Sequence, residues 1–207
     1  MIRTIILLAF GLLVTLAPAQ ENLYDPVLSA DSAFVRILQA DAAASTTQAN
    51  VGEVVFEGLE YGGVSPYQVV PQGDYTASFG DAALTVTIEA GKFYSLAFTP
   101  TGVSALEDPV NGNMTKTMLV LYNLSDVASV DMKTADGSTA VVPGVAAGTQ
   151  SSILVNPIAV DLAAFANDDA VDTFAGLNLQ AGAVYSLVVM GGADDLSASW
   201  TASQVQR

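Results

Sequence analysis

The chain has 207 residues, of which 21 are acidic and six are basic, and it carries a formal net charge of −15 without a single histidine or cysteine. A surface of this charge repels nucleic acids and other polyanions, because binding them requires clustered lysine or arginine side chains. The missing residue types exclude Ser-His-Asp and Cys-His catalysis, and they exclude metal sites built from imidazole or thiolate groups.

The first 19 residues have the pattern of a secretory signal peptide. Arg3 is followed by an apolar run over residues 5–16 and then by Ala17, Pro18 and Ala19. A positive start, a short apolar middle and small residues at the end are typical of a segment that is cleaved after export. The run is short for a membrane span, and an uncleaved anchor is the alternative. We therefore expect cleavage near Ala19 and export of the mature chain.

Residues 20–32 form a short N-terminal segment ahead of the first clear strand. This segment contains the sequence Leu23-Tyr24-Asp25-Pro26. Exposed aromatic residues are frequent anchors in protein–protein contacts, so these four residues are candidate partner-binding residues. The alternative is that Tyr24 packs against the first domain.

Arg36 is a further candidate partner-binding residue. It lies in the middle of an expected strand over residues 33–41, on the same face as Phe34 and Leu38. A cation at this place either pairs with a carboxylate inside the fold or marks the docking point of an acidic partner. The sequence leaves both interpretations open.

The decapeptide EAGKFYSLAF at residues 89–98 returns as QAGAVYSLVV at residues 180–189, with five identical positions. Ahead of the first copy, residues 84–88 alternate apolar and polar side chains, and Ala90-Gly91 offers a tight turn. We therefore predict a β-hairpin that joins residues 84–88 to the strand that follows the turn. That strand is apolar on both faces in both copies, which predicts a central position covered on two sides. Whether the second cover comes from the same domain or from the other one stays open.

The repeat indicates a duplicated domain. Short alternating segments, separated by turn residues roughly every 8–12 positions and without a convincing long helix, are typical of β-sandwiches. Residues 158–166 are rich enough in alanine for a helix, but their counterpart over residues 73–80 resembles a strand, so both are predicted as strands. We predict an all-β protein of two tandem immunoglobulin-like β-sandwiches, over residues 33–100 and 117–207. A linker rich in Pro, Gly and Asn joins them over residues 101–116.

The acidic residues offer no pattern that indicates catalysis. The Asp pairs at positions 168–169 and 194–195 are neighbours in loops, whereas a glycosidase needs two carboxylates that face each other across a cleft. The loops over residues 108–113 and 167–169 lack the pattern of an EF-hand calcium site. Neither a GxSxG sequence nor a phosphate-binding glycine loop occurs. We therefore predict no catalytic residue, no cofactor and no metal ligand.

A series of short sequences spread along the chain points to one protein family. They are LYDP from residue 23, SAFVR from residue 32, PQGDY from residue 71, EAGKFYSL from residue 89, LEDPVNGNMTK from residue 106, NLSD from residue 123, KTADG from residue 133 and NPIAVDLA from residue 156. In this order they resemble the AlgF family, which assists the O-acetylation of alginate in the periplasm. The resemblance covers nearly the whole mature chain.

This resemblance implies a periplasmic protein without acetyltransferase activity of its own. Such proteins work beside membrane-anchored and periplasmic O-acetyltransferases, which carry the Ser-His-Asp sites. Related proteins serve cellulose acetylation, so the polymer stays open between alginate and another polysaccharide. The negative charge disfavours direct binding of a polyanionic polymer and favours protein partners, although it also suits simple solubility or a saline environment. The alternatives are a generic secreted or cell-surface adhesion module and an enzyme whose site the sequence does not reveal.

Overall fold

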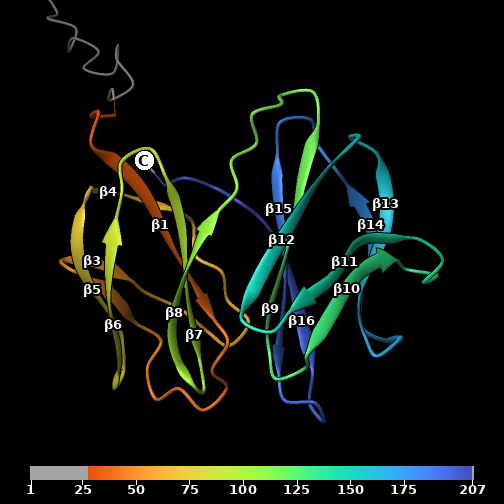
Figure 1. The fold of residues 1–207 in the computed structure, drawn as a ribbon, viewed down its shortest axis with the longest axis horizontal. Coiled ribbons are helices and arrows are strands. Elements are labelled where there is room, and N and C mark those ends of the chain that lie inside the picture. The colour runs from red at the N-terminus through yellow and green to blue at the C-terminus, as the bar shows by residue number, and fades with distance from the viewer. Residues whose placement is uncertain (1–27, 207) are drawn as a thin grey trace, which may run out of the picture.

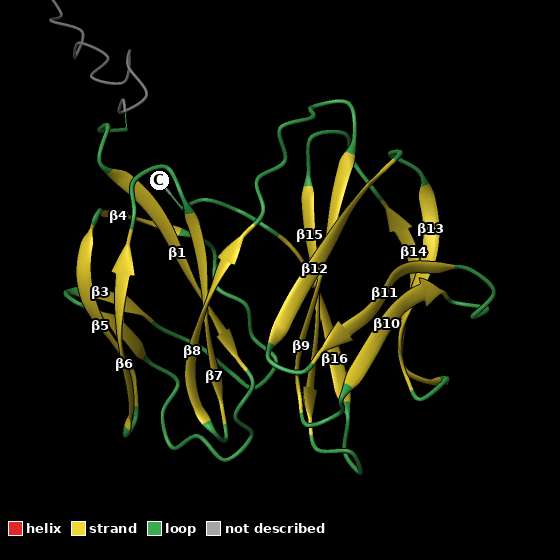
Figure 2. Cartoon of the chain, in the orientation of Figure 1, coloured by secondary structure: helices red, strands yellow, loops and turns green. Residues whose placement is uncertain are grey.

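The structure is a computed structural model that describes residues 28–206. Over these residues it contains sixteen strands and no helix (Figure 2). The strands form two β-sandwich domains that lie side by side (Figure 1), so the prediction of an all-β protein with two tandem sandwiches is confirmed. The predicted signal peptide and the candidate residues 23–26 lie outside the described part of the chain. Within that part, no helix is long and apolar enough to cross a membrane.

The first domain consists of two four-stranded sheets, with the orders β4-β1-β7-β8 and β3-β2-β5-β6. Its strands are β1 (Ser32–Gln39), β2 (Ala49–Val51), β3 (Val54–Phe56), β4 (Gln68–Pro71), β5 (Gly73–Phe79), β6 (Ala82–Ile88), β7 (Phe93–Thr99) and β8 (Gly102–Asp108). The central strands β1 and β7 run parallel to each other, and the other neighbours in these sheets are antiparallel.

The second domain repeats this topology with every strand number raised by eight. Its sheets have the orders β12-β9-β15-β16 and β11-β10-β13-β14, and the central strands β9 and β15 are again parallel. The strands are β9 (Thr117–Ser125), β10 (Ser129–Thr134), β11 (Ala140–Ala146), β12 (Thr149–Val155), β13 (Ala159–Ala166), β14 (Asp169–Asn178), β15 (Val184–Gly191) and β16 (Ser197–Ala202). The shared topology supports the duplication, and β13 confirms the strand predicted for the alanine-rich segment.

The two copies of the decapeptide end in the central strands β7 and β15. Both strands are buried on both faces along most of their length, as predicted. The turn ahead of each strand contains a glycine with a positive φ, 75° at Gly91 and 77° at Gly182. A residue with a Cβ atom is disfavoured in this conformation, which explains why the repeat keeps glycine there.

The predicted hairpin between β6 and β7 is wrong. β6 pairs with β5, while β7 pairs with β1 and β8, so the turn at Gly91 crosses from one sheet of the sandwich to the other. The apolar patterns explain the separation. β6 has a single apolar face and suits the edge of an outer sheet, whereas β7 has two apolar faces and suits a sheet that is covered on both sides.

The predicted linker over residues 101–116 is too long. Its first half forms β8, which pairs with β7 along its whole length and completes the sheet of the first domain. The residues that join the two domains are therefore 109–116, where the Pro, Gly and Asn residues of the predicted linker are concentrated. The composition of β8 is mixed and resembles that of a loop, which is why it was included in the predicted linker. Only the turn-forming residues after β8 mark the true connection.

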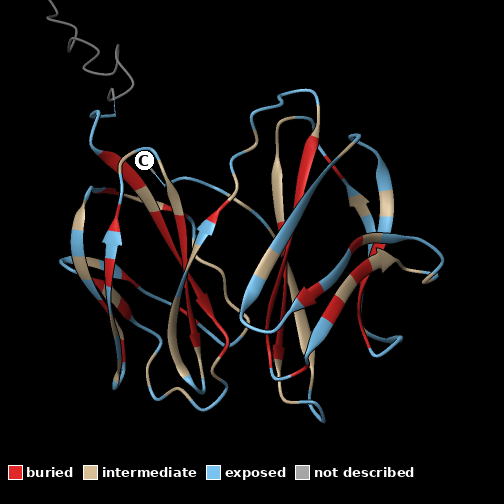
Figure 3. Cartoon of the chain, viewed as in Figure 1, coloured by how far each residue is buried: buried red, intermediate tan, exposed pale blue. Residues whose placement is uncertain are grey.

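Three apolar clusters stabilise the molecule, one inside each sandwich and a third between them. Figure 3 shows the buried residues concentrated on the two central strand pairs. Successive side chains of these strands point alternately into their own domain and toward the other one. The third cluster consists of Leu38, Ala40, Ala97, Met118, Val120, Tyr122, Leu124, Val188 and Met190. The two domains thus pack sheet against sheet, and the second cover of β7 and β15 comes from the neighbouring domain.

Candidate functional site

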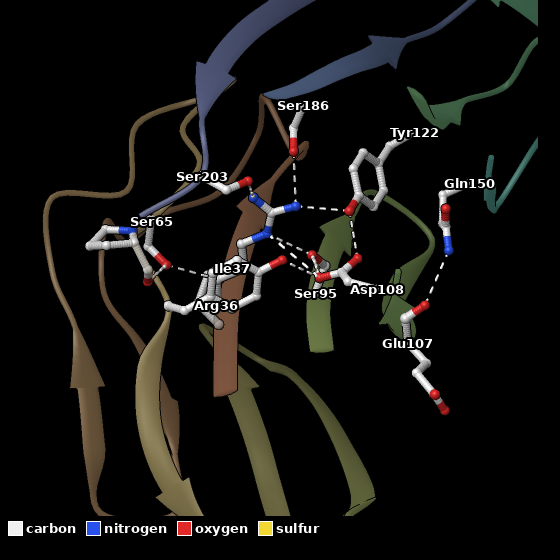
Figure 4. A network of polar contacts seen from close by, with 12 residues as sticks. Arg36, Ile37, Ser65, Ser95, Glu107, Asp108, Tyr122, Gln150, Ser186 and Ser203 are labelled. Carbon is white, nitrogen blue, oxygen red and sulfur yellow. Dashed lines mark hydrogen bonds and ion pairs between the residues drawn. The ribbon is translucent and has the colours of Figure 1, made fainter. Parts of the chain in front are cut away.

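Arg36 lies at the centre of the contact between the domains. It projects from the middle of β1 and is 1% exposed. Its guanidinium donates four hydrogen bonds (Figure 4), from Nε to Ser95 at 2.8 Å, from Nη1 to Ser203 at 3.0 Å, and from Nη2 to Tyr122 at 2.8 Å and Ser186 at 3.0 Å. Three of these acceptors belong to the second domain. A single side chain of the first domain therefore ties the two sheets together.

Asp108, the last residue of β8, is the acidic partner of Arg36. Its Oδ2 lies 3.7 Å from Arg36 Nε, and both side chains are almost fully buried. The carboxylate also accepts hydrogen bonds from three hydroxyls, those of Tyr67 at 2.6 Å, of Ser95 and of Tyr122. The Arg36 guanidinium lies over the ring of Tyr67, 4.6 Å from its centroid. A buried ion pair is stable only when such additional contacts satisfy the remaining groups, and here they do.

The repeated decapeptide supplies a serine to this network from each domain. Ser95 and Ser186 occupy the same place in the two copies, neither has any exposed surface, and both accept a hydrogen bond from Arg36. The cation itself is not repeated. Strand register pairs Ser95 with Arg36 in the first domain and Ser186 with Val120 in the second. The two copies therefore differ at this position, and one arginine serves both serines.

Burial and charge shift the acid–base properties of the network. Burial alone lowers the pKa of Arg36, but Tyr122, Tyr67 and Asp108 around it more than offset this effect and raise the pKa above its usual value. Burial raises the pKa of the Tyr67 and Tyr122 hydroxyls well above that of a free phenol, and the nearby guanidinium opposes this shift without reversing it. At physiological pH, Arg36 is charged and both phenols are neutral donors to Asp108.

These shifts predict that the protein loses stability above pH 10. Below the ordinary phenol pKa of about 10, Tyr67 and Tyr122 are neutral in both folded and unfolded chains, so their stabilisation is complete. Above pH 10, the two phenols ionise in the unfolded chain but stay neutral in the folded chain, where their pKa values are raised. Each phenol therefore lowers the free energy of unfolding by about 1.4 kcal/mol per pH unit until the pH reaches its pKa in the folded protein. Urea unfolding between pH 8 and pH 11 measures this slope.

The control for the alkaline slope is the double variant Tyr67→Phe/Tyr122→Phe. It lacks both phenols, so its slope above pH 10 should be smaller than that of the wild type, whatever its stability at pH 8. Absorbance at 295 nm reports tyrosine ionisation. The variant should have two fewer tyrosines than the wild type whose ionisation accompanies unfolding. Equal slopes for the two proteins would mean that these phenols ionise freely in the folded state.

The C-terminal segment, residues 203–206, closes one side of the interface by crossing back to the first domain. Ser203 contacts Arg36, and Val205 forms a parallel bridge with Tyr67. The Tyr67 amide donates to the carbonyl of Gln204 at 2.7 Å, and the Gln206 amide donates to the carbonyl of Tyr67 at 2.8 Å. The network is thus enclosed by residues from both ends of the described chain. Its other hydroxyls, those of Tyr67, Ser95, Tyr122 and Ser186, are buried and hydrogen-bonded, so they are poorly placed to meet a substrate in solution, whereas Ser203 is partly exposed.

An open cleft of about 540 Å³ lies at one end of the interface, away from Arg36. It is formed where the turn between β7 and β8 meets the ends of β9 and β15. Its larger polar side chains are Tyr61, Asp126 and Asp195, and no lysine or arginine is among its lining residues. A cleft with carboxylates and no cation does not suit an anionic polymer.

The four cations in residues 28–206 are largely engaged within the protein. Arg36 is buried with Asp108, and Lys116 donates to the Asn156 side chain at 2.6 Å. The other two form surface ion pairs, Lys92 with Glu89 and Glu107, and Lys133 with Asp131 and Asp168. The described surface therefore has no cluster of cations with which to hold a chain of carboxylates.

The structure corrects the prediction that Arg36 is a docking residue. Its side chain lies on the Phe34 and Leu38 side of β1 as expected, but the second domain covers that side and leaves no surface for a partner. Of the two interpretations, pairing with a carboxylate is the one that the structure shows. The other candidates, residues 23–26, lie outside the described residues, so their docking role stays a prediction.

The sequence does not identify the partners of Arg36. Asp108 falls in the predicted linker, and Ser95 and Ser186 are one of the five identical positions of the repeat. One signal was present, because each serine stands between apolar residues on a strand that was predicted to be covered on both faces. A hydroxyl at such a place must find a buried partner. Tyr122 and Tyr67 gave no comparable signal.

Comparison with known proteins gives consistent matches along most of the chain. The family model described as "Alginate O-acetyl transferase AlgF" matches residues 6–186. The alginate biosynthesis protein AlgF of Pseudomonas syringae pv. tomato is 34% identical over 197 residues, which cover 93% of this chain and 87% of that protein. AlgF of Pseudomonas putida is 33% identical over 190 residues, 91% of this chain and 87% of that protein.

Two of the solved structures that match are single domains. The C-terminal domain of AlgF from P. aeruginosa is 32% identical with a TM-score of 0.39, over 42% of this chain and 98% of that domain. The N-terminal domain of the same protein is 28% identical with a TM-score of 0.33, over 38% of this chain and 95% of that domain.

Proposed function

The chain belongs to the AlgF family, and from this membership we propose that it acts in the O-acetylation of alginate as a non-catalytic adaptor in the periplasm. In this role it binds the membrane-anchored and periplasmic O-acetyltransferases that carry the reactive side chains. It contributes a rigid pair of sandwiches and a binding surface, while the partners make and break the ester bonds.

The observation that carries this proposal is the burial of the polar network. Ser95 and Ser186 have no exposed surface and are engaged by Arg36, and the chain has neither histidine nor cysteine to activate another hydroxyl. The acidic surface and the engaged cations argue against holding the anionic polymer directly. Both points favour protein partners over contact with alginate.

Deleting the gene tests the proposal. The deletion strain should still secrete the polymer, but with a large loss of ester-linked acetyl groups measured by proton NMR, because the acetyltransferases lack their adaptor. Expression of the full chain from a plasmid should restore the acetyl content. Unchanged acetylation in the deletion strain would contradict a role in this reaction.

A second measurement tests the non-catalytic part separately. The purified chain is incubated with acetylated alginate, and with an activated acetyl ester in the presence of unacetylated alginate. We expect no release or transfer of acetyl groups above the rate without protein. Release or transfer by the purified chain alone would identify it as an enzyme.

A further inference from the structure

β12 has a long free edge. β12 lies at the outside of the sheet β12-β9-β15-β16 and pairs only with β9, through seven consecutive residues without a bulge. In residues 28–206, no backbone hydrogen bond joins residues 150–155 to anything except β9. Alternate amide and carbonyl groups along its other side are therefore free for another strand.

Apart from β6, the remaining edge strands have features that prevent this kind of pairing. β3 and β4 have only three and four residues, and β4 ends at Pro71. β11 contains Pro143 and, like β14, has register shifts against its neighbour. A carboxylate oxygen of Asp172 occupies a backbone amide of β16, and β8 ends in two acidic residues. Short length, proline, bulges and charge are the means by which proteins block edge-to-edge association, and β12 has none of them.

The side chains of β12 are also unusual for this surface. Ile153 and Leu154 are 40% and 43% exposed, beside the exposed Ser151 and Ser152. The strand lies within residues 137–160, a run of 24 positions without a charged residue in a chain that has 21 acidic ones. β6 has a free edge of equal length, but its exposed positions are alanine and threonine. An exposed uncharged edge with large aliphatic side chains is the signature of a binding edge.

The first domain shows a short backbone pairing of this kind next to the corresponding place. β4 occupies in its sheet the position that β12 occupies in the second domain. The C-terminal segment pairs with Tyr67, the residue directly before β4, through two backbone hydrogen bonds. The equivalent edge of the second domain is longer and has no such cover among the described residues.

We propose that β12 is a docking edge to which an extended segment of an O-acetylation partner protein adds as a fifth strand. The partner segment is neutral or basic and has aliphatic side chains at alternating positions, where they contact Ile153 or Leu154 according to the face. A second copy of this chain is the less favoured occupant, because each copy carries a net charge of −15 and the two repel each other. This inference rests on the proposed adaptor function and names the surface that it uses.

Lysine substitutions on the edge test the inference. Leu154→Lys and Ser152→Lys each place a charge on an exposed position of β12, whereas Thr85→Lys does the same on the exposed face of β6. In cells that lack the chromosomal gene, both β12 variants should reduce co-purification of the alginate O-acetyltransferases about tenfold or more and lower polymer acetylation. Thr85→Lys should match the wild type in both assays. Thermal unfolding followed by Trp200 fluorescence verifies that each variant is folded, because a folded variant should have the midpoint of the wild type. If Leu154→Lys fails to fold, Ser152→Lys alone tests the edge.

The outcomes separate this inference from the proposed function. If deletion lowers acetylation but both β12 variants bind the acetyltransferases and restore acetylation like the wild type, the docking edge is wrong while the adaptor function stands. If deletion itself leaves acetylation unchanged, the adaptor function fails.

A photo-crosslinking residue at position 153 should attach to one of the acetyltransferases. A crosslinked dimer of this chain, together with a dimer in light scattering that Leu154→Lys abolishes, would assign the edge to a second copy and overturn the inference.

Discussion

Replacing Arg36 with methionine is expected to lower the free energy of unfolding by about 3–5 kcal/mol. The variant leaves the Asp108 carboxylate buried without its cation, and it removes four hydrogen bonds, three of which reach the second domain. Removal of one partner from a buried ion pair costs more than the pair itself contributes, because the remaining charge stays desolvated. Urea unfolding at pH 7 measures the change.

Two controls decide whether the loss of stability comes from the unpaired Asp108 carboxylate. The double variant Arg36→Met/Asp108→Leu removes both charges, so it should be destabilised by less than the sum of the two single variants. Lys92→Met removes a surface cation that is paired with two carboxylates, and it should have a much smaller effect than Arg36→Met because water screens these exposed ion pairs. Additive effects in the double variant would show that Arg36 and Asp108 do not stabilise each other.

Replacing Leu38 with alanine is expected to cost about 2–5 kcal/mol and to destabilise both domains together. Leu38 belongs to the first domain, has no exposed surface and packs in the cluster between the sheets. The one tryptophan of the chain, Trp200, packs against the core of the second domain. If the interface couples the domains, the unfolding transition seen by Trp200 should move to lower urea concentration, although the substitution lies in the other domain.

The matched control for Leu38→Ala is Thr85→Ala, which removes an exposed side chain of β6 in the same domain. Its effect should stay within about 0.5 kcal/mol. Circular dichroism follows both domains at once and should give the same midpoint as Trp200 fluorescence for the wild type and for Leu38→Ala. A Trp200 transition that Leu38→Ala leaves in place would mean that the domains unfold independently.

The sequence predicted the layout of the fold because its strongest signals are local. Alternation of apolar and polar residues identifies strands, and the repeated decapeptide identifies two related domains, even where alanine-rich β13 resembles a helix. Strand partners are set by contacts distant in sequence, which is why the expected hairpin of β6 and β7 proved to be a crossing between sheets. The end of the first domain was misplaced for the same reason, since β8 is a strand only through its pairing with β7.

The candidate site was predictable only in part. Arg36 stood out because cations are scarce, but its partners come from six other places in the chain, and no spacing rule connects them. The decapeptide serines carried a readable signal, namely a hydroxyl on a doubly covered strand. The free edge of β12 had no such signal, because the sequence of a strand does not show whether a second strand pairs with its other side.

The contact between Arg36 and Ser203 joins residues 167 positions apart, and this separation bears on how the protein matures. In the export that we propose, β1 is delivered first and the C-terminal segment last. Until residues 203–206 arrive, Arg36 lacks its Ser203 acceptor and Tyr67 lacks its backbone partners, while Asp108, Ser95, Tyr122 and Ser186 can already contact the guanidinium. The first domain therefore depends in part on residues that follow the second domain in the chain, and loss of residues 203–206 would alter contacts at Arg36 and Tyr67.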